Sequence, residues 1–286
     1  MKPRANEKGC LEMRVLISVD MEGIAGVSGT QDTLYGRPNY DRFRRLMTDE
    51  TNLAVEAAFA AGADSVVVND SHDGMRNVMY EVLDDRAELI SGFNKPLCMM
   101  EGAQEADAVV CIGYHAWAGT AQAALDHTIS GGQIHNWWLN DRLVGETQIN
   151  AALAAHYGAP IVFVSGDDKL AEQVAGSLPG ARTAVVKYAI DSMCVRSQPL
   201  SVVRRLLREG VEEAVRGHAT VPVQRVVGPV TFRMEFKRSS HAEVACLLPM
   251  VRRVDGRTVE VTGADALEAW RLAFGAMRLG STCDMG

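Results

Sequence analysis

Three apolar runs in the first 115 residues each end in side chains that can ligate a divalent metal. Asp20 and Glu22 follow the run 15–19, His72 follows the run 66–68 after three polar residues, and His115 closely follows the run 108–112. Ligands of open α/β sheets bind at the carboxyl ends of the strands, so we expect these segments to converge at one sheet edge. The period of two in extended chain places Asp20 and Glu22 on the same side. The sequence therefore predicts a metal site at this edge.

The first two-thirds of the chain alternate apolar runs with helical stretches. Such alternation predicts an α/β fold with a mostly parallel sheet, right-handed crossovers and flanking helices. A hairpin is expected within 136–144, where Asn140-Asp141 favours a turn. The other predicted strands are 14–20, 64–69, 87–91, 107–113 and 159–165, and the predicted helices are 40–61, 74–83, 101–106, 146–157 and 167–177.

The texture of the chain changes after about residue 180. No histidine-and-acid pattern occurs there, and Asp255-Gly256 is a strong hairpin signal. We interpret 13–180 as a metal-binding α/β catalytic domain, 181–286 as a smaller α+β domain for assembly and cleft shaping, and 1–12 as a disordered extension. The elements expected in the second part are strand 181–187, helix 200–216, strand 229–237, helix 239–248, paired strands within 250–261 and helix 263–278.

Two further acidic residues have alternative interpretations. Glu146 follows Gly145 in the first turn of a predicted helix, where its carboxylate could face a metal or complement the helix dipole. Asp167 follows the run 159–165, where it could cap the next helix or face the cleft. Sequence alone leaves both pairs of alternatives open.

Composition excludes several classes of function and partner. The formal net charge of −7 argues against nucleic-acid or anionic-membrane partners. No uncharged apolar run reaches the length of about 18 residues that a transmembrane helix needs. The six cysteines are scattered and contain no Cys-x-x-Cys pair, which argues against a thiolate zinc site and fits a reducing cytoplasm. No phosphate-binding Gly-rich motif and no Gly-x-Ser-x-Gly elbow is present.

The residue types at the predicted edge favour zinc. Mixed histidine and carboxylate ligands suit catalytic Zn²⁺, and one carboxylate can bridge two metals. A carboxylate at Asp70 or Asp73 could orient His72 through its second ring nitrogen, as metal-ligating histidines commonly require. His127 lies beside the constellation in sequence. We expect a metal-centred hydrolase.

Six ordered blocks between residues 13 and 168 carry a family resemblance. They resemble the zinc-dependent D-aminopeptidases of bacterial dipeptide operons, of the dipeptide transport protein A type. The blocks are Ser18-Val19-Asp20-Met21-Glu22-Gly23, Asn69-Asp70-Ser71-His72-Asp73, Gly113-Tyr114-His115, His127-Thr128-Ile129-Ser130, Gly145-Glu146-x-x-Ile149-Asn150-Ala151 and Val164-Ser165-Gly166-Asp167-Asp168.

The resemblance implies a two-zinc aminopeptidase that hydrolyses the N-terminal bond of short peptides, D-amino-acid peptides among them, through a metal-bridging hydroxide. It also implies a cytoplasmic, ring-like homo-oligomer, with a decamer expected. Alternatives that the residues leave open are a metal-dependent amidase or phosphoesterase and a non-catalytic peptide-binding module. The resemblance places the metal ligands at Asp20 (the bridge), Glu22, His72, His115 and Glu146, and the catalytic histidine at His127.

Overall fold

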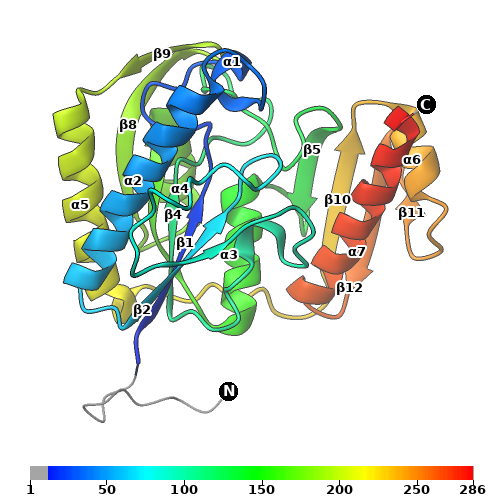
Figure 1. The fold of residues 1–286 in the computed structure, drawn as a ribbon. Helices are drawn as coiled ribbons and strands as arrows, with labels where there is room; N and C mark the ends of the chain where they lie inside the picture. The colour runs from blue at the N-terminus through cyan, green and yellow to red at the C-terminus, as the bar shows by residue number, and fades with distance from the viewer. Residues whose placement is uncertain (1–11, 286) are drawn as a thin grey trace.

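A seven-stranded sheet organises the larger part of the molecule in the computed structural model, which describes residues 12–285 (Figure 1). Its strand order is β3-β2-β1-β4-β7-β8-β9, and every neighbouring pair is parallel except β8 with β9. The predicted, mostly parallel sheet is confirmed. The strands are β1 (Arg14–Val19), β2 (Ser65–Asp70), β3 (Glu88–Ile90), β4 (Ala108–Ile112), β7 (Ile161–Asp167), β8 (Arg182–Asp191) and β9 (Cys194–Ser197).

A second, five-stranded antiparallel sheet lies beside the first. Its order is β11-β12-β10-β5-β6, so the predicted hairpin β5–β6 pairs with a strand almost a hundred residues later in the chain. The buried rings of Trp137 on this sheet and Trp270 on a covering helix stack with centroids 6.1 Å apart. The strands are β5 (Ile134–Leu139), β6 (Arg142–Leu143), β10 (Val230–Phe236), β11 (Arg252–Arg253) and β12 (Thr258–Gly263).

Helices cover both faces of the large sheet. Helices α2 and α5 pack on one face, where Val55 and Leu207 share a core, while α3 lies between the two sheets, where Leu153 shares a core with Trp137 (Figure 1). The α-helices are α1 (Thr30–Thr33), α2 (Tyr40–Ala60), α3 (Glu146–Tyr157), α4 (Asp168–Ser177), α5 (Leu200–Arg216), α6 (Ser239–Ala245) and α7 (Ala266–Gly280); the 3-10 helices are η1 (Cys98–Met100), η2 (His218–Thr220) and η3 (Ser281–Met285).

The division between the sheets does not coincide with the expected boundary after residue 180. Strands β8 and β9 and helix α5 follow that residue but belong to the large sheet, whereas β5 and β6 precede it and belong to the small one. Strand pairing is non-local here, because β8 adds beside β7 while β5 pairs with β10. A change of composition along the chain therefore does not show which sheet a strand joins.

Two predicted helices are wrong. Residues 74–83 form turns because the Asp70 carboxylate accepts hydrogen bonds from the backbone N–H groups of Asn77 and Val78, which leaves those donors unavailable to a helix. Residues 101–106 also form turns, after η1. Gly102 there has φ +100, in the left-handed region that ends helices.

The structure includes little of the extension predicted for residues 1–12. Of these residues only Glu12 is described, so the prediction of disorder lies outside the described residues. Among the helices of residues 12–285, none combines the length and apolar character that crossing a membrane requires.

Candidate metal centre

The carboxyl ends of β1, β2 and β4 meet where the loop after β1 touches the end of β4. The Asp20 N–H donates to the Ile112 carbonyl at 2.8 Å, and the Gly23 N–H donates to the Gly113 carbonyl at 2.7 Å. Gly113 has φ +72, and a Cβ atom there would lie 2.2 Å from the Asp20 carbonyl oxygen. Only glycine permits this approach. The predicted convergence of the segments carrying Asp20 and His115 is therefore built into the backbone.

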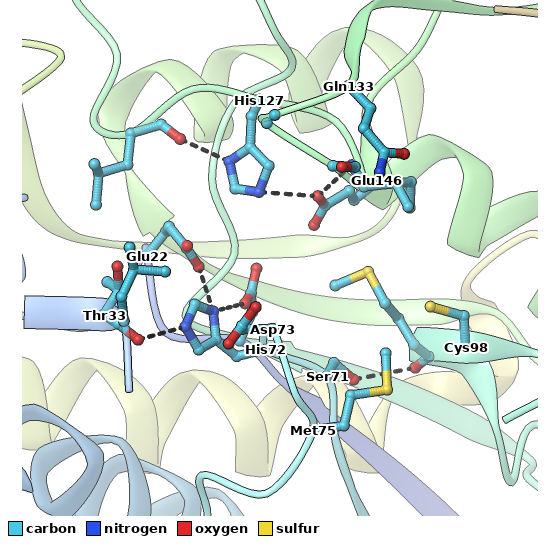
Figure 2. Close-up of a pocket in the computed structure, with 18 of the residues that line it drawn as sticks. Glu22, Thr33, Ser71, His72, Asp73, Met75, Cys98, His127, Gln133 and Glu146 are labelled. Atoms are coloured by element: carbon cyan, nitrogen blue, oxygen red, sulfur yellow. Dashed lines mark hydrogen bonds and ion pairs between the residues drawn. The ribbon is translucent and has the colours of Figure 1, made fainter. Parts of the chain in front are cut away.

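One group of candidate ligands consists of Asp20, Glu22 and His72. Nδ1 of His72 lies 3.2 Å from Asp20 Oδ1. It also lies 2.9 Å from Glu22 Oε2 (Figure 2). All three residues are at most 7% exposed. The group offers one imidazole nitrogen and two carboxylates, a donor set typical of catalytic zinc.

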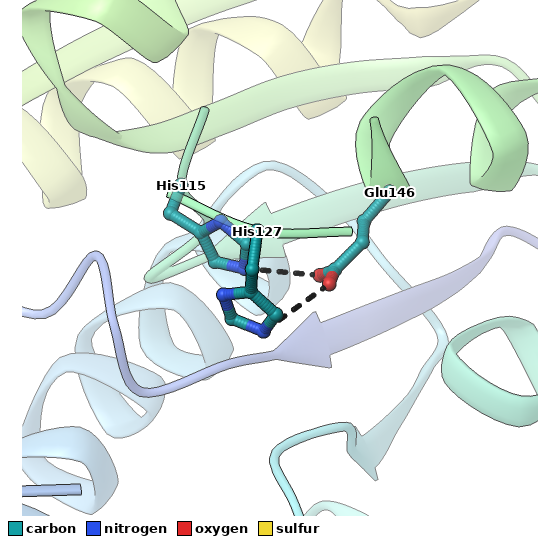
Figure 3. A group of neighbouring side chains, drawn as sticks. All are labelled: His115, His127 and Glu146. Carbon is teal, nitrogen blue, oxygen red and sulfur yellow. Dashed lines mark ion pairs between the residues drawn. The ribbon is translucent and has the colours of Figure 1, made fainter. Parts of the chain in front are cut away.

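A second group consists of His115, His127 and Glu146, drawn in Figure 3. Nε2 of His115 lies 3.3 Å from Glu146 Oε2, and Nε2 of His127 lies 3.6 Å from Glu146 Oε1. The two imidazole rings stack with centroids 4.1 Å apart. Glu146 is the first residue of α3, and its carboxylate also accepts a hydrogen bond from the Ile129 N–H at 2.7 Å. The sequence left open whether Glu146 faces a metal or complements the helix dipole. Its position allows both, because the carboxylate faces the site from the positive end of α3.

Asp20 lies between the two groups. Its Oδ1 is 3.2 Å from His72 Nδ1 in the first group, and its Oδ2 is 3.5 Å from His115 Nε2 in the second. One carboxylate thus presents a different oxygen to each group. This is the arrangement that a carboxylate shared between two metal ions requires.

Backbone carbonyls set the tautomers of the two candidate ligand histidines. Nε2 of His72 lies 2.9 Å from the Thr33 carbonyl, and Nδ1 of His115 lies 3.0 Å from the Ala116 carbonyl. A carbonyl can only accept, so each of these nitrogens carries a proton, which leaves Nδ1 of His72 and Nε2 of His115 free to ligate a metal. Both free nitrogens face carboxylates of the site.

The expected partner of His72 was therefore wrong. Asp70 and Asp73 do not contact its second ring nitrogen, which faces the Thr33 carbonyl. Asp70 instead holds the loop after β2, because its carboxylate accepts hydrogen bonds from the backbone N–H and the side chain of Asn77. The Asn77 side chain in turn donates to the His72 carbonyl at 2.6 Å. Asp70 acts on His72 through the backbone. Asp73 is an exposed residue of the cavity wall.

The charges of the cluster favour bound cations. Burial and the charge of Glu22 raise the pKa of Asp20 to about 8. Burial alone would lower the pKa of His115, but the carboxylates of Glu146 and Asp20 raise it to about 10. Burial likewise opposes protonation of His72, yet Glu22 and Asp20 hold its pKa well above the usual value. Three buried carboxylates thus attract positive charge, which divalent cations would supply more effectively than protons.

The residues present fit a metal. Nε2 of His115 is buried and makes no hydrogen bond within residues 12–285, although two carboxylates lie 3.3–3.5 Å away. A buried nitrogen of this kind carries a desolvation cost of about 1–3 kcal/mol unless it finds a partner. A cation between His115, Glu146 and Asp20 would provide that partner.

Lys187 supports the site and was missed by the sequence interpretation. Its side chain is fully buried, and its ammonium group donates to the backbone carbonyls of Glu22, Ile24 and Val27. These bonds hold the loop that carries Glu22. Strand alternation would expose Lys187, because Ala184 and Val186 are buried. The register of β8 shifts between Val185 and Lys187, so Val186 and Lys187 are both buried, and the sequence carries no signal of this shift.

Asp167 caps a helix and does not face the cleft, the two alternatives that the sequence left open. Its Oδ1 accepts the Leu170 N–H at 2.8 Å and caps α4, and its Oδ2 accepts the Ala124 N–H at 2.8 Å. Asp167 therefore anchors the loop that precedes His127 to the end of β7 and does not line the cavity of the metal centre.

Comparisons with known proteins agree with the geometry of the site. The family model Peptidase_M55, described as D-aminopeptidase, matches residues 13–274. The D-aminopeptidase of Bacillus subtilis strain 168 is 37% identical over 262 residues, which cover 91% of this chain and 94% of that protein. A solved structure of the Zn-dependent D-aminopeptidase DppA from Bacillus subtilis, a self-compartmentalizing protease, matches with a TM-score of 0.90 and 35% identity. That match covers 94% of this chain and 98% of the other.

These matches confirm the resemblance expected from the six motifs. The family match begins just before β1 and continues into α7, so it includes the candidate ligands and both sheets. The chain belongs to the D-aminopeptidase family Peptidase_M55.

Proposed function

We propose that this protein is a zinc-dependent aminopeptidase that uses two zinc ions to cleave the N-terminal bond of short peptides, including those that contain D-amino acids. The observation that carries the proposal is the position of Asp20, whose two oxygens face two separate ligand groups. Support also comes from the relative that is described as a Zn-dependent D-aminopeptidase.

In this proposal Asp20, Glu22 and His72 hold one zinc ion, and Asp20, His115 and Glu146 hold the other. When bound, zinc supplies Lewis acidity toward the scissile carbonyl and a source of hydroxide at neutral pH. The protein contributes the enclosure, because the five ligands are each at most 7% exposed. Exclusion of water strengthens the electrostatic interactions in such a site.

His127 is then left for proton transfer. Its Nδ1 lies 2.8 Å from the Leu125 carbonyl and therefore carries the proton of the neutral ring. Burial holds the pKa of His127 below its usual value, which favours the neutral ring and leaves its Nε2 with a free lone pair. Nε2 can accept the proton of the attacking water and pass it to the leaving amine. This role separates His127 from the ligands, although it lies beside Glu146.

We also propose a closed, cytoplasmic homo-oligomer, with ten subunits as the expected number. Self-compartmentalisation is described for the DppA relative, whose structure covers 94% of this chain. An enclosed active site would admit short peptides and exclude folded proteins. Light scattering should show a particle larger than a dimer. An active monomer at the assay concentration would contradict this part of the proposal.

The proposed activity is tested with the zinc-loaded protein and four substrates of matched size. The substrates are an L-dipeptide, its D-counterpart, the same dipeptide with a blocked amine, and a phosphodiester. We expect cleavage of free-amine dipeptides and no cleavage of the blocked peptide or the phosphodiester. Cleavage of the blocked peptide would instead indicate an amidase, and turnover of the phosphodiester a phosphoesterase. Peptide binding without any turnover would indicate a non-catalytic module.

A further inference from the structure

The metal centre opens into a cavity of about 660 Å³, part of whose wall is drawn in Figure 2. Besides the metal-site carboxylates, the wall contains the acidic side chains of Asp73 and Asp126. Among the described residues that line the cavity, Arg278 is the one lysine or arginine. Apart from the histidines of the metal centre, the other charged side chains of the cavity wall are therefore carboxylates.

Arg278 lies in the last turn of α7, far along the sequence from every metal-site motif. Its guanidinium carbon lies 3.9 Å from the centre of the Phe93 ring and 5.8 Å from that of Phe274. Within residues 12–285, no hydrogen bond or ion pair joins the guanidinium group of Arg278 to another residue, and its backbone carbonyl accepts from the Ser281 hydroxyl. The side chain is half-buried. Its charge is thus held in place by aromatic rings and left without an anionic partner.

The contact with Phe93 leaves the binding capacity of Arg278 intact. An arginine that lies over an aromatic ring uses the face of its guanidinium group, whereas its five N–H donors point outward in the plane of that group. The planar donors match the two oxygens of a carboxylate in a bidentate pair. A stacked, unpaired arginine in a substrate cavity is therefore prepared to bind a planar anion.

The substrate itself provides such an anion. Under the proposed function, the N-terminal bond of a short peptide lies at the metal centre, and the peptide's remaining charge is its C-terminal carboxylate. We propose that Arg278 binds this carboxylate, so that the enzyme selects short peptides with a free C-terminus over amidated peptides of the same sequence. This inference rests on the proposed function and adds the substrate class to it.

The test uses a dipeptide and a tripeptide. Each peptide is compared in two forms, one with a free C-terminal carboxylate and one with a C-terminal amide. Replacing Arg278→Met should lower kcat/KM for the free acids by about 10- to 100-fold, mainly through KM, because a charged hydrogen-bonded pair is lost. The values for the amides should stay within about twofold of the unmodified enzyme. Arg278→Lys should retain an intermediate preference. Arg271→Met is the matched control, because Arg271 is an exposed residue of the same helix outside the cavity wall.

A binding measurement separates this inference from the proposed function. In zinc-loaded protein carrying His127→Ala, calorimetry should show tighter binding of the free acid than of the amide, and Arg278→Met should abolish the difference. Equal binding of acid and amide, or equal loss of both in the Arg278→Met protein, would overturn the inference. If the preference is present but the enzyme cleaves neither peptide, the proposed activity fails and the role of Arg278 stands. If both peptides are cleaved with no effect of Arg278→Met, the activity stands and the role of Arg278 fails.

Discussion

Replacing His72 and His127 separately distinguishes a metal ligand from a proton carrier. Nδ1 of His72 faces both Asp20 and Glu22, at 3.2 and 2.9 Å, whereas Nε2 of His127 faces one carboxylate of the described residues, that of Glu146, at 3.6 Å. His72→Ala removes one of the three donors of its group. Loss of an outer-shell partner already weakens metal binding about 10- to 100-fold, so loss of a direct ligand should weaken this zinc site by more than about 100-fold.

His127→Ala should have a different outcome. Both zinc ions should remain, while turnover falls by roughly 10² to 10⁴, the scale of a lost general acid or base. His135→Ala is the matched control, since His135 is exposed on β5 and does not line the cavity. Zinc content by elemental analysis and kcat are measured on the same preparations. If His127→Ala loses as much zinc as His72→Ala, His127 is a ligand and our assignment is wrong; full zinc with full turnover would make it structural.

Three further replacements test the scaffold. Burial raises the pKa of Glu50 to about 7. Its folded state therefore binds more protons than the unfolded state between about pH 4.5 and 7, so stability should fall as pH rises through this window, and Glu50→Gln should remove up to about 1.4 kcal/mol per pH unit of that slope in denaturant titrations. Gly113→Ala should lower the unfolding free energy by about 2 kcal/mol and reduce zinc content, because its Cβ would lie 2.2 Å from the Asp20 carbonyl; a stability equal to that of the unmodified protein would refute the close approach. Lys187→Met should weaken zinc binding about 10- to 100-fold in a chelator competition, since the loop carrying Glu22 loses its charged donor, and unchanged affinity would show that the loop holds without it.

Sequence patterns predicted the parts of the site that lie at strand ends. Asp20, Glu22, His72 and His115 each follow an apolar run, and the strand-end rule for parallel sheets brings such residues together without knowledge of the strand order. Glu146 was recognisable as the first residue of a helix. In each case the residues next to the ligand in sequence indicate its position. That the ligands meet at one sheet edge follows from the fold class.

The partners of these residues could not be predicted because they come from distant segments. The carbonyl that orients His72 belongs to Thr33, and a backbone atom has no sequence signature. Lys187 reaches its carbonyl partners only because β8 adds to the large sheet, a pairing that the expected boundary at residue 180 had placed in another domain. Arg278 lines the cavity from α7, more than a hundred residues after the last predicted metal ligand, Glu146.

The zinc content of the active enzyme tests the central claim most directly. Asp20 faces two ligand groups with different oxygens, so the protein, loaded with zinc and freed of excess metal, should contain two zinc ions per chain by elemental analysis when its specific activity is maximal. A reproducible content near one zinc ion per chain at full activity would contradict the shared role of Asp20.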